Sequence, residues 1–132
     1  ISVELIDRVL AEVRLMLAST RGPCGFIAVL EPSAPTPSLA VRERQRQIVK
    51  ASETIGDVKM ALVVVGEGVQ AMLTRTISRA ILHQSKKHRV VDDVAEAARW
   101  VSPHIGAPVL DVVAVVQEAR RLLLDEVGSP AQ

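Results

Sequence analysis

Two neighbouring carboxylates, Asp92 and Asp93, are the most direct candidates for acid–base chemistry in this chain. Paired carboxylates can divide the roles of general acid and general base between them. Asp93 is also followed by Glu96 at the spacing of a helix capping box, with Asp in place of Ser or Thr. Because capping of the following helix accounts for these residues without a reaction, we predict that the chain is not an enzyme and has no catalytic residues.

The usual metal-binding and nucleophile patterns do not occur in the sequence. His83, His88 and His104 form neither a His-x-x-x-His nor a His-Glu-x-x-His motif, and no Gly-x-Ser-x-Gly turn is present. Cys24 is the only cysteine, which excludes an intramolecular disulfide. We therefore predict no metal and no cofactor, and we expect Cys24 to be a small buried hydrophobic residue of a cytoplasmic protein.

A glycine turn lies where a phosphate-binding loop would lie, between an apolar run and a helix. Gly66, Glu67 and Gly68 occupy this turn, and helix N-termini attract anions. There is no third glycine at the dinucleotide-binding spacing and no Gly-Lys-Ser/Thr sequence, and Glu67 would repel a phosphate. A tight turn is the simpler interpretation. We keep the three residues as candidates for a contact with another protein.

A basic stretch follows on the next helix. Arg75, Arg79, His83 and Lys86 are spaced by four, four and three residues, so they share one helical face. This face is either solvated or meets an acidic protein partner, for which Arg75 and Arg79 are the candidate residues. Nucleic acid is not expected as a partner, because 16 basic and 15 acidic residues leave a net charge of +1 and only 2% of residues are aromatic.

The elements that must position these residues alternate along the chain, which has the length of one domain at 132 residues. Apolar runs predict strands, and apolar residues spaced by three and four predict helices. The predicted order is α-β-α-β-α-β-α-α, which is typical of an α/β fold with a small, mostly parallel or mixed sheet of three to four strands. We assign residues 1–128 to the domain and residues 129–132 to a disordered tail. The strands cover residues 26–30, 58–65 and 88–91, and the helices cover residues 2–19, 39–55, 69–86, 109–127 and a segment from Asp92-Asp93 to about Pro103.

The run from Met60 to Val65 is the longest apolar stretch, so no membrane span is expected. Its continuous apolarity predicts a central strand covered on both faces. The last helix, residues 109–127, has an apolar arc wider than a surface helix needs. Either this arc is buried on the sheet or part of it meets another chain. The second interpretation predicts a homodimer through this helix, with the candidate contact residues Val112, Val116 and Leu123.

Three segments give the chain a family resemblance. They are residues 26–30 with the proline-bearing loop that follows, residues 60–68 opening a helix, and residues 88–101 with their closing strand and aromatic-ended helix. Between Gly25 and Gly106 the chain resembles the STAS domains, and it is most similar to their short, divergent bacterial members. The resemblance implies a sheet of about four strands and a binding or regulatory role without enzyme activity.

Two features depart from that family. Its switching members carry a phosphorylated Ser or Thr in the strand-to-helix turn, whereas the corresponding residues 65–69 contain no hydroxyl group. The family's usual leading strand also has no counterpart. We therefore predict a regulatory protein-interaction module that self-associates, without a phosphorylation switch at this turn. The alternative is a carrier of a small lipophilic ligand held in the Met- and Val-rich interior. A carrier needs a cavity, and an interaction module needs an exposed apolar patch.

Overall fold

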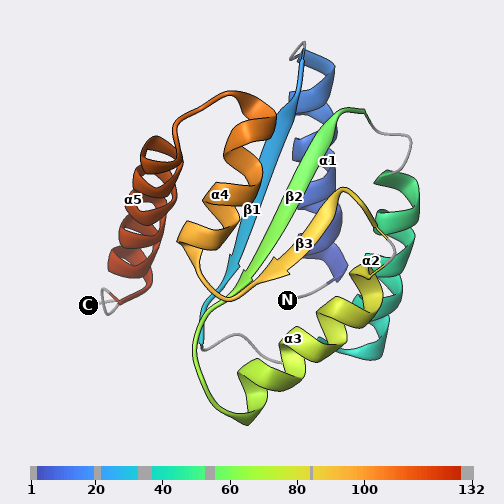
Figure 1. Ribbon diagram of the computed structural model, residues 1–132. Helices are drawn as coiled ribbons and strands as arrows, with labels where there is room; N and C mark the ends of the chain where they lie inside the picture. Colours follow the sequence, from blue (N-terminus) through green and yellow to red (C-terminus); the bar gives the residue numbers. More distant parts are fainter. Residues whose placement is uncertain (1–2, 20–21, 33–36, 53–55, 84, 129–132) are drawn as a thin grey trace.

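The computed structural model describes residues 3–19, 22–32, 37–52, 56–83 and 85–128. Helices and strands alternate along the chain as the sequence predicts (Figure 1). The predicted tail 129–132 and the end of the second predicted helix, residues 53–55, lie outside the described residues. In chain order the elements are α1 (Val3–Ser19), β1 (Cys24–Leu30), α2 (Leu39–Ser52), β2 (Val58–Val64), α3 (Val69–Leu82), β3 (His88–Val91), α4 (Val94–Ile105) and α5 (Val109–Gly128).

The described strands form one parallel sheet in the order β1-β2-β3. β1 pairs with β2 from Cys24↔Val58 to Leu30↔Val64, and β3 pairs with the second half of β2. The central place of β2 explains its apolar sequence, because helices cover both of its faces and Ala61 and Val63 are buried. The predicted α/β fold with a small parallel sheet is therefore confirmed, and β3 lies at an edge of the sheet.

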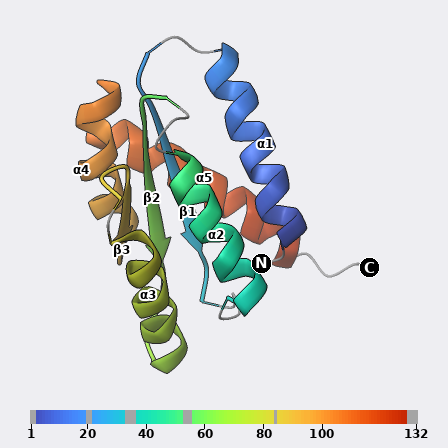
Figure 2. The same cartoon turned by 90° about the vertical axis from the view of Figure 1, so that its right-hand side faces the viewer.

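The helices form a layer on each face of the sheet. α1, α2 and α3 lie on one side, and α4 and α5 lie on the other (Figures 1 and 2). α2 and α3 connect successive parallel strands and lie on the same face, which is the arrangement that right-handed crossovers produce. The buried core lies under α4, where side chains of β2, β3 and α4 meet. Its members are Ala61, Val63, Val91, Val94, Ala97 and Val101.

α4 approaches β1 so closely that one strand position has no room for a side chain. A Cβ atom at Gly25 would lie 2.3 Å from Cγ1 of Val101, which is fully buried. Gly25 therefore has a steric role, and its backbone does not need a positive φ angle. Ala97 and Ala98, which are also buried, keep the helix close to the sheet one turn earlier.

The end of α4 differs from the sequence prediction. We expected the helix to end at or before Pro103, but it continues to Ile105 and encloses the proline in its last turn. The missing N–H of Pro103 removes one helical hydrogen bond, which costs less in the last turn than in the middle of a helix. Gly106 then ends the helix in a left-handed conformation, and its N–H donates to the carbonyl of Ser102 (2.9 Å).

The contact between Gly25 and Val101 yields a first prediction. Gly25→Ala should lower the free energy of unfolding by about 1 to 3 kcal/mol, because the added methyl group overpacks a contact that has no space for it. Ala28→Val, on the opposite face of the same strand, is the matched control. Its side chain points into a cavity, so we expect a change within about 0.5 kcal/mol or a gain. Urea unfolding measures both, and equal effects would contradict the steric assignment.

Candidate functional site

The glycine turn between β2 and α3 is shaped by backbone conformation and by a neighbouring proline. Gly66 and Gly68 have φ angles of 106° and 99°, which favour glycine strongly. A Cβ atom at Gly66 would also lie 3.2 Å from the ring of Pro32. Gly68 occupies the N-cap position of α3 and, having no side chain, provides no capping hydrogen bond. These constraints account for both glycines as turn residues, and Glu67 between them is exposed.

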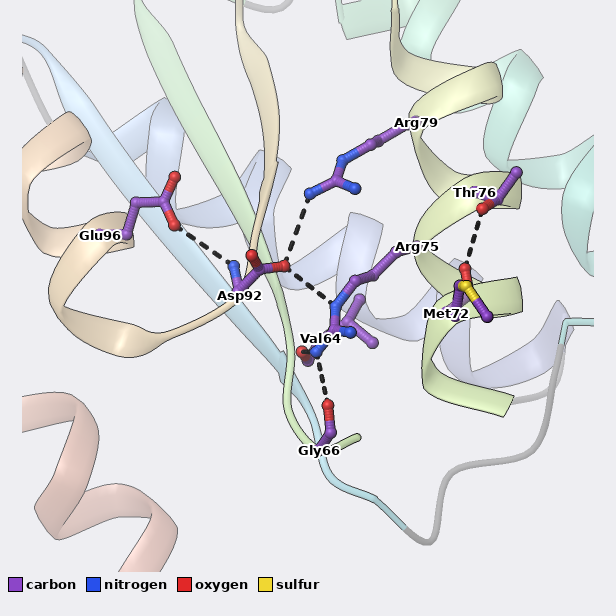
Figure 3. A network of polar contacts seen from close by, with 8 residues as sticks. All are labelled: Val64, Gly66, Met72, Arg75, Thr76, Arg79, Asp92 and Glu96. Carbon is purple, nitrogen blue, oxygen red and sulfur yellow. Dashed lines mark hydrogen bonds and ion pairs between the residues drawn. The ribbon is translucent and has the colours of Figure 1, made fainter. Parts of the chain in front are cut away.

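Arg75 of α3 ties the carboxyl ends of two strands together (Figure 3). Its Nη2 donates to the carbonyl oxygens of Val64 (2.8 Å) and Gly66 (2.6 Å), at the end of β2. Its Nε forms an ion pair with Oδ1 of Asp92 (3.0 Å), directly after β3, without the alignment of a hydrogen bond. The side chain is 19% exposed. Arg75 therefore holds the fold together at this end of the sheet, and a partner would meet little of it.

The two adjacent carboxylates have different neighbours, which separates their roles. Asp92 Oδ1 lies between the guanidinium groups of Arg75 and Arg79, the latter at 3.5 Å. Asp93 caps α4, because its side chain accepts from the backbone N–H of Glu96 (2.8 Å). The return contact of Glu96 reaches the N–H of Asp92 at 3.5 Å (Figure 3). The predicted capping by Asp93 is confirmed, and the two carboxylates have separate partners.

The histidines lie apart and have individual partners. His88 contacts the hydroxyl of Ser85 (2.7 Å), and His104 Nε2 lies 3.1 Å from Oδ1 of Asp57. The ring of His83 lies against the carbonyl of Ala80. Within the described part of the chain, no group of three His, Cys, Asp or Glu side chains is placed to hold a metal ion. Cys24 is buried, as predicted.

α5 packs on α4 and faces β1 across an apolar cavity of about 620 Å³. Val112, Val116 and Leu123, which the sequence analysis selected, all line this cavity. The flank of α5 beside it is exposed: Val115, Leu122 and Leu123 are 70%, 55% and 56% accessible. Val115, Ala119 and Leu122 follow one another at spacings of four and three, so they form one stripe. We call this stripe, with Leu123, the α5 stripe.

One ion pair closes the cavity at its polar end. Arg120 of α5 donates from Nε and Nη2 to both carboxylate oxygens of Glu31, at 2.6 and 3.0 Å. These hydrogen bonds raise the pKa of Arg120, so the guanidinium stays protonated. This pair could not be predicted from the sequence, because 89 residues separate its members. No local pattern links a residue that follows the first strand to a residue of the last helix.

A second apolar cavity lies on the opposite face of the sheet, with a volume of about 530 Å³. Its walls come from α1, α2 and α3 and from the faces of β1 and β2 that point toward these helices. Gln45 lines it, and the Oε1 atom of Gln45 is buried without a hydrogen-bond partner among the described residues. The aliphatic members of its wall include Leu5, Val9, Val13, Ala28, Leu30, Ile48, Leu62 and Ile81. The structure thus contains both a cavity and an exposed apolar stripe.

Comparison with protein-family models, with curated proteins and with solved structures finds no match to the chain. Among the described residues, no helix combines the length and the apolar character that a membrane crossing requires.

The contacts of Arg75 yield a second prediction. Arg75→Ala should lower the free energy of unfolding by about 2 kcal/mol, because the carbonyl groups of Val64 and Gly66 lose a charged donor. Arg79→Ala removes the same charge from a side chain that is 54% exposed, and it should cost less than about 0.5 kcal/mol. Thermal and urea unfolding of the two variants measure the difference. Equal, small effects would show that Arg75 does not stabilise this end of the sheet.

Proposed function

We propose that this domain is a non-enzymatic, regulatory protein-interaction module that acts in the cytoplasm, and that its docking surface is the α5 stripe with the adjoining cavity wall. The observation that carries the proposal is the position of α5, which rests on α4 and leaves a continuous apolar surface on the side toward β1. An exposed apolar patch of this kind marks interaction sites on proteins. The resemblance to STAS domains supports the same class of function.

Self-association through residues 109–127 is the form of this proposal that the sequence favours. Within the stripe, Val115 and Leu122 are open to a partner, whereas Val112 and Val116 lie deeper, on the cavity wall. Val115, Ala119 and Leu123 belong to both surfaces, because they also line the cavity. Charged residues beside the stripe, such as Asp111 and Arg120, would set the orientation of the partner. Glu67 and Arg79 are exposed at the carboxyl end of the sheet, and their contact with a partner stays a prediction.

Two adjacent residues of α5 provide a matched test. Val115→Glu places a charge in the stripe, whereas Ala114→Glu places it on the exposed face next to the stripe. We expect a dimer of the parent protein in sedimentation velocity, a shift of Val115→Glu to monomer by at least about tenfold in Kd, and no shift for Ala114→Glu. Equal behaviour of the two variants, or a monomeric parent protein, would contradict self-association through this helix.

The cavity of about 530 Å³ supports a second candidate, a carrier of a small lipophilic ligand. The wall is apolar, and the buried Oε1 of Gln45 could accept a hydrogen bond from one polar group of such a ligand. Native mass spectrometry with a denatured control distinguishes the two functions. A carrier should release an extra mass on denaturation, and Ala28→Phe, which fills the cavity, should abolish that adduct. A dimer without an adduct would support the interaction module instead.

A further inference from the structure

The outer edge of β1 carries backbone groups that the sheet does not use. Cys24 N–H bonds to Asp57 and the carbonyl of Leu30 accepts from Val65, so the even-numbered residues of β1 face β2. Hydrogen bonding alternates along a parallel strand. The N–H and C=O groups of Gly25, Ile27 and Val29 therefore point away from the sheet. Among the described residues, no strand pairs with this edge.

Helices overhang the open edge on both faces. α5 packs chiefly on α4, which covers the strands on one face, and α1 packs chiefly on α2 on the other face. Figure 2 shows both of them extending past β1 on the side away from β2, and Figure 1 shows them on opposite faces of the sheet. The edge thus opens into a slot between α1 and α5.

The two apolar cavities meet at this slot. One lies between β1 and α5, and the other lies between β1 and α1. Ile27 and Val29 line both of them, although neighbouring side chains of a strand point to opposite faces. The outer backbone of β1 is therefore accessible from above and below. A single extended strand in the plane of the sheet would contact both the open edge and the two cavities.

We infer that the outer edge of β1 is a binding site for one extended β-strand, apolar on both faces, that a partner polypeptide presents. This inference rests on the proposed function, because it names the element that the partner contributes. Main-chain hydrogen bonds to Gly25, Ile27 and Val29 would hold the strand, and its side chains would enter the two cavities. Since both walls are apolar, the central residues of the strand are uncharged and read as a continuous apolar run. A segment of about five to seven residues would match β1.

The overhang also decides against a second copy of this domain as the occupant. Pairing of β1 with β1 of another copy would bring α1 and α5 of both copies to the same edge. Because both helices extend past β1, the helices of a second copy would meet those of the first (Figure 2). An edge that is flanked by helices in this way is protected from sheet-to-sheet association, which open edges otherwise promote.

Amide hydrogen exchange of the whole protein, followed by NMR, tests the inference. The probe is a peptide with the sequence of residues 60–65, which is apolar on both faces, extended by terminal lysines for solubility. In the free protein, the amides of Ile27 and Val29 should exchange rapidly, while those of Phe26 and Ala28, which bond to β2, are protected. The peptide should slow Ile27 and Val29 by at least about tenfold. The same peptide with Ala61→Asp and Leu62→Asp should not, because the slot cannot solvate two charges.

Two variants at one position separate the backbone contact from side-chain packing. Ile27→Pro removes the outward N–H without breaking a hydrogen bond to β2. Edge strands tolerate proline at positions whose N–H points away from the sheet. Ile27→Ala removes more side chain than Ile27→Pro does and keeps the N–H, so it is a conservative control for lost packing. Peptide binding should fall at least about tenfold further for the proline variant than for the alanine variant. If the proline variant does not fold, the exchange pattern of the parent protein decides alone.

The result that overturns the inference is protection of Ile27 and Val29 in the free monomer, or equal protection by both peptides. Failure of this inference can be told apart from failure of self-association through α5. A dimer that depends on Val115 but leaves these two amides exposed and unresponsive to the peptide keeps self-association and removes the strand site. If the peptide slows exchange of these two amides in a protein that is monomeric, the strand site is kept and self-association is removed.

Discussion

The close contact between α4 and the sheet is the constraint on which the rest of this structure depends. Gly25 has no side chain, so Val101 can lie directly on β1, and the buried alanines of α4 bring the helix down onto β2 and β3. That contact fixes the position of α4, and α5 packs on α4 in turn. α5 therefore lies further out than α4 and does not cover β1 directly.

The unusual surfaces of the domain follow from this placement. α5 cannot bury its full apolar arc on a helix, so the α5 stripe stays accessible and a cavity remains between α5 and β1. On the other face, α1 packs chiefly on α2. Apolar surface that folding leaves exposed is available for association, which is why we place the interaction function here. Both proposals use this one region, at different atoms: side chains of α5 in the first and backbone groups of β1 in the second.

The carboxyl end of the parallel sheet, where ligands bind in many α/β proteins, serves a structural purpose in this chain. Arg75 directs its donors to the carbonyl groups of Val64 and Gly66 and its charge to Asp92. Asp93 is engaged in capping α4, and Pro32 fills the space beside Gly66. The charged groups of this end pair with one another, and a cluster whose charges are already paired offers little to a charged ligand.

The sequence by itself determined the order of the elements, the central place of β2 and the cap at Asp93, because these features depend on residues within a few positions of one another. It also selected Val112, Val116 and Leu123, since the width of a helical apolar arc is a local property. Only the tertiary structure decided that Gly25 admits Val101, that Arg120 meets Glu31, that Arg75 turns inward and that the edge of β1 opens between two helices. Each of these features joins segments that are far apart in the chain. Such contacts leave no periodic pattern in the sequence. Nothing in the local sequence distinguishes a glycine or an arginine that has a distant partner from one that has none.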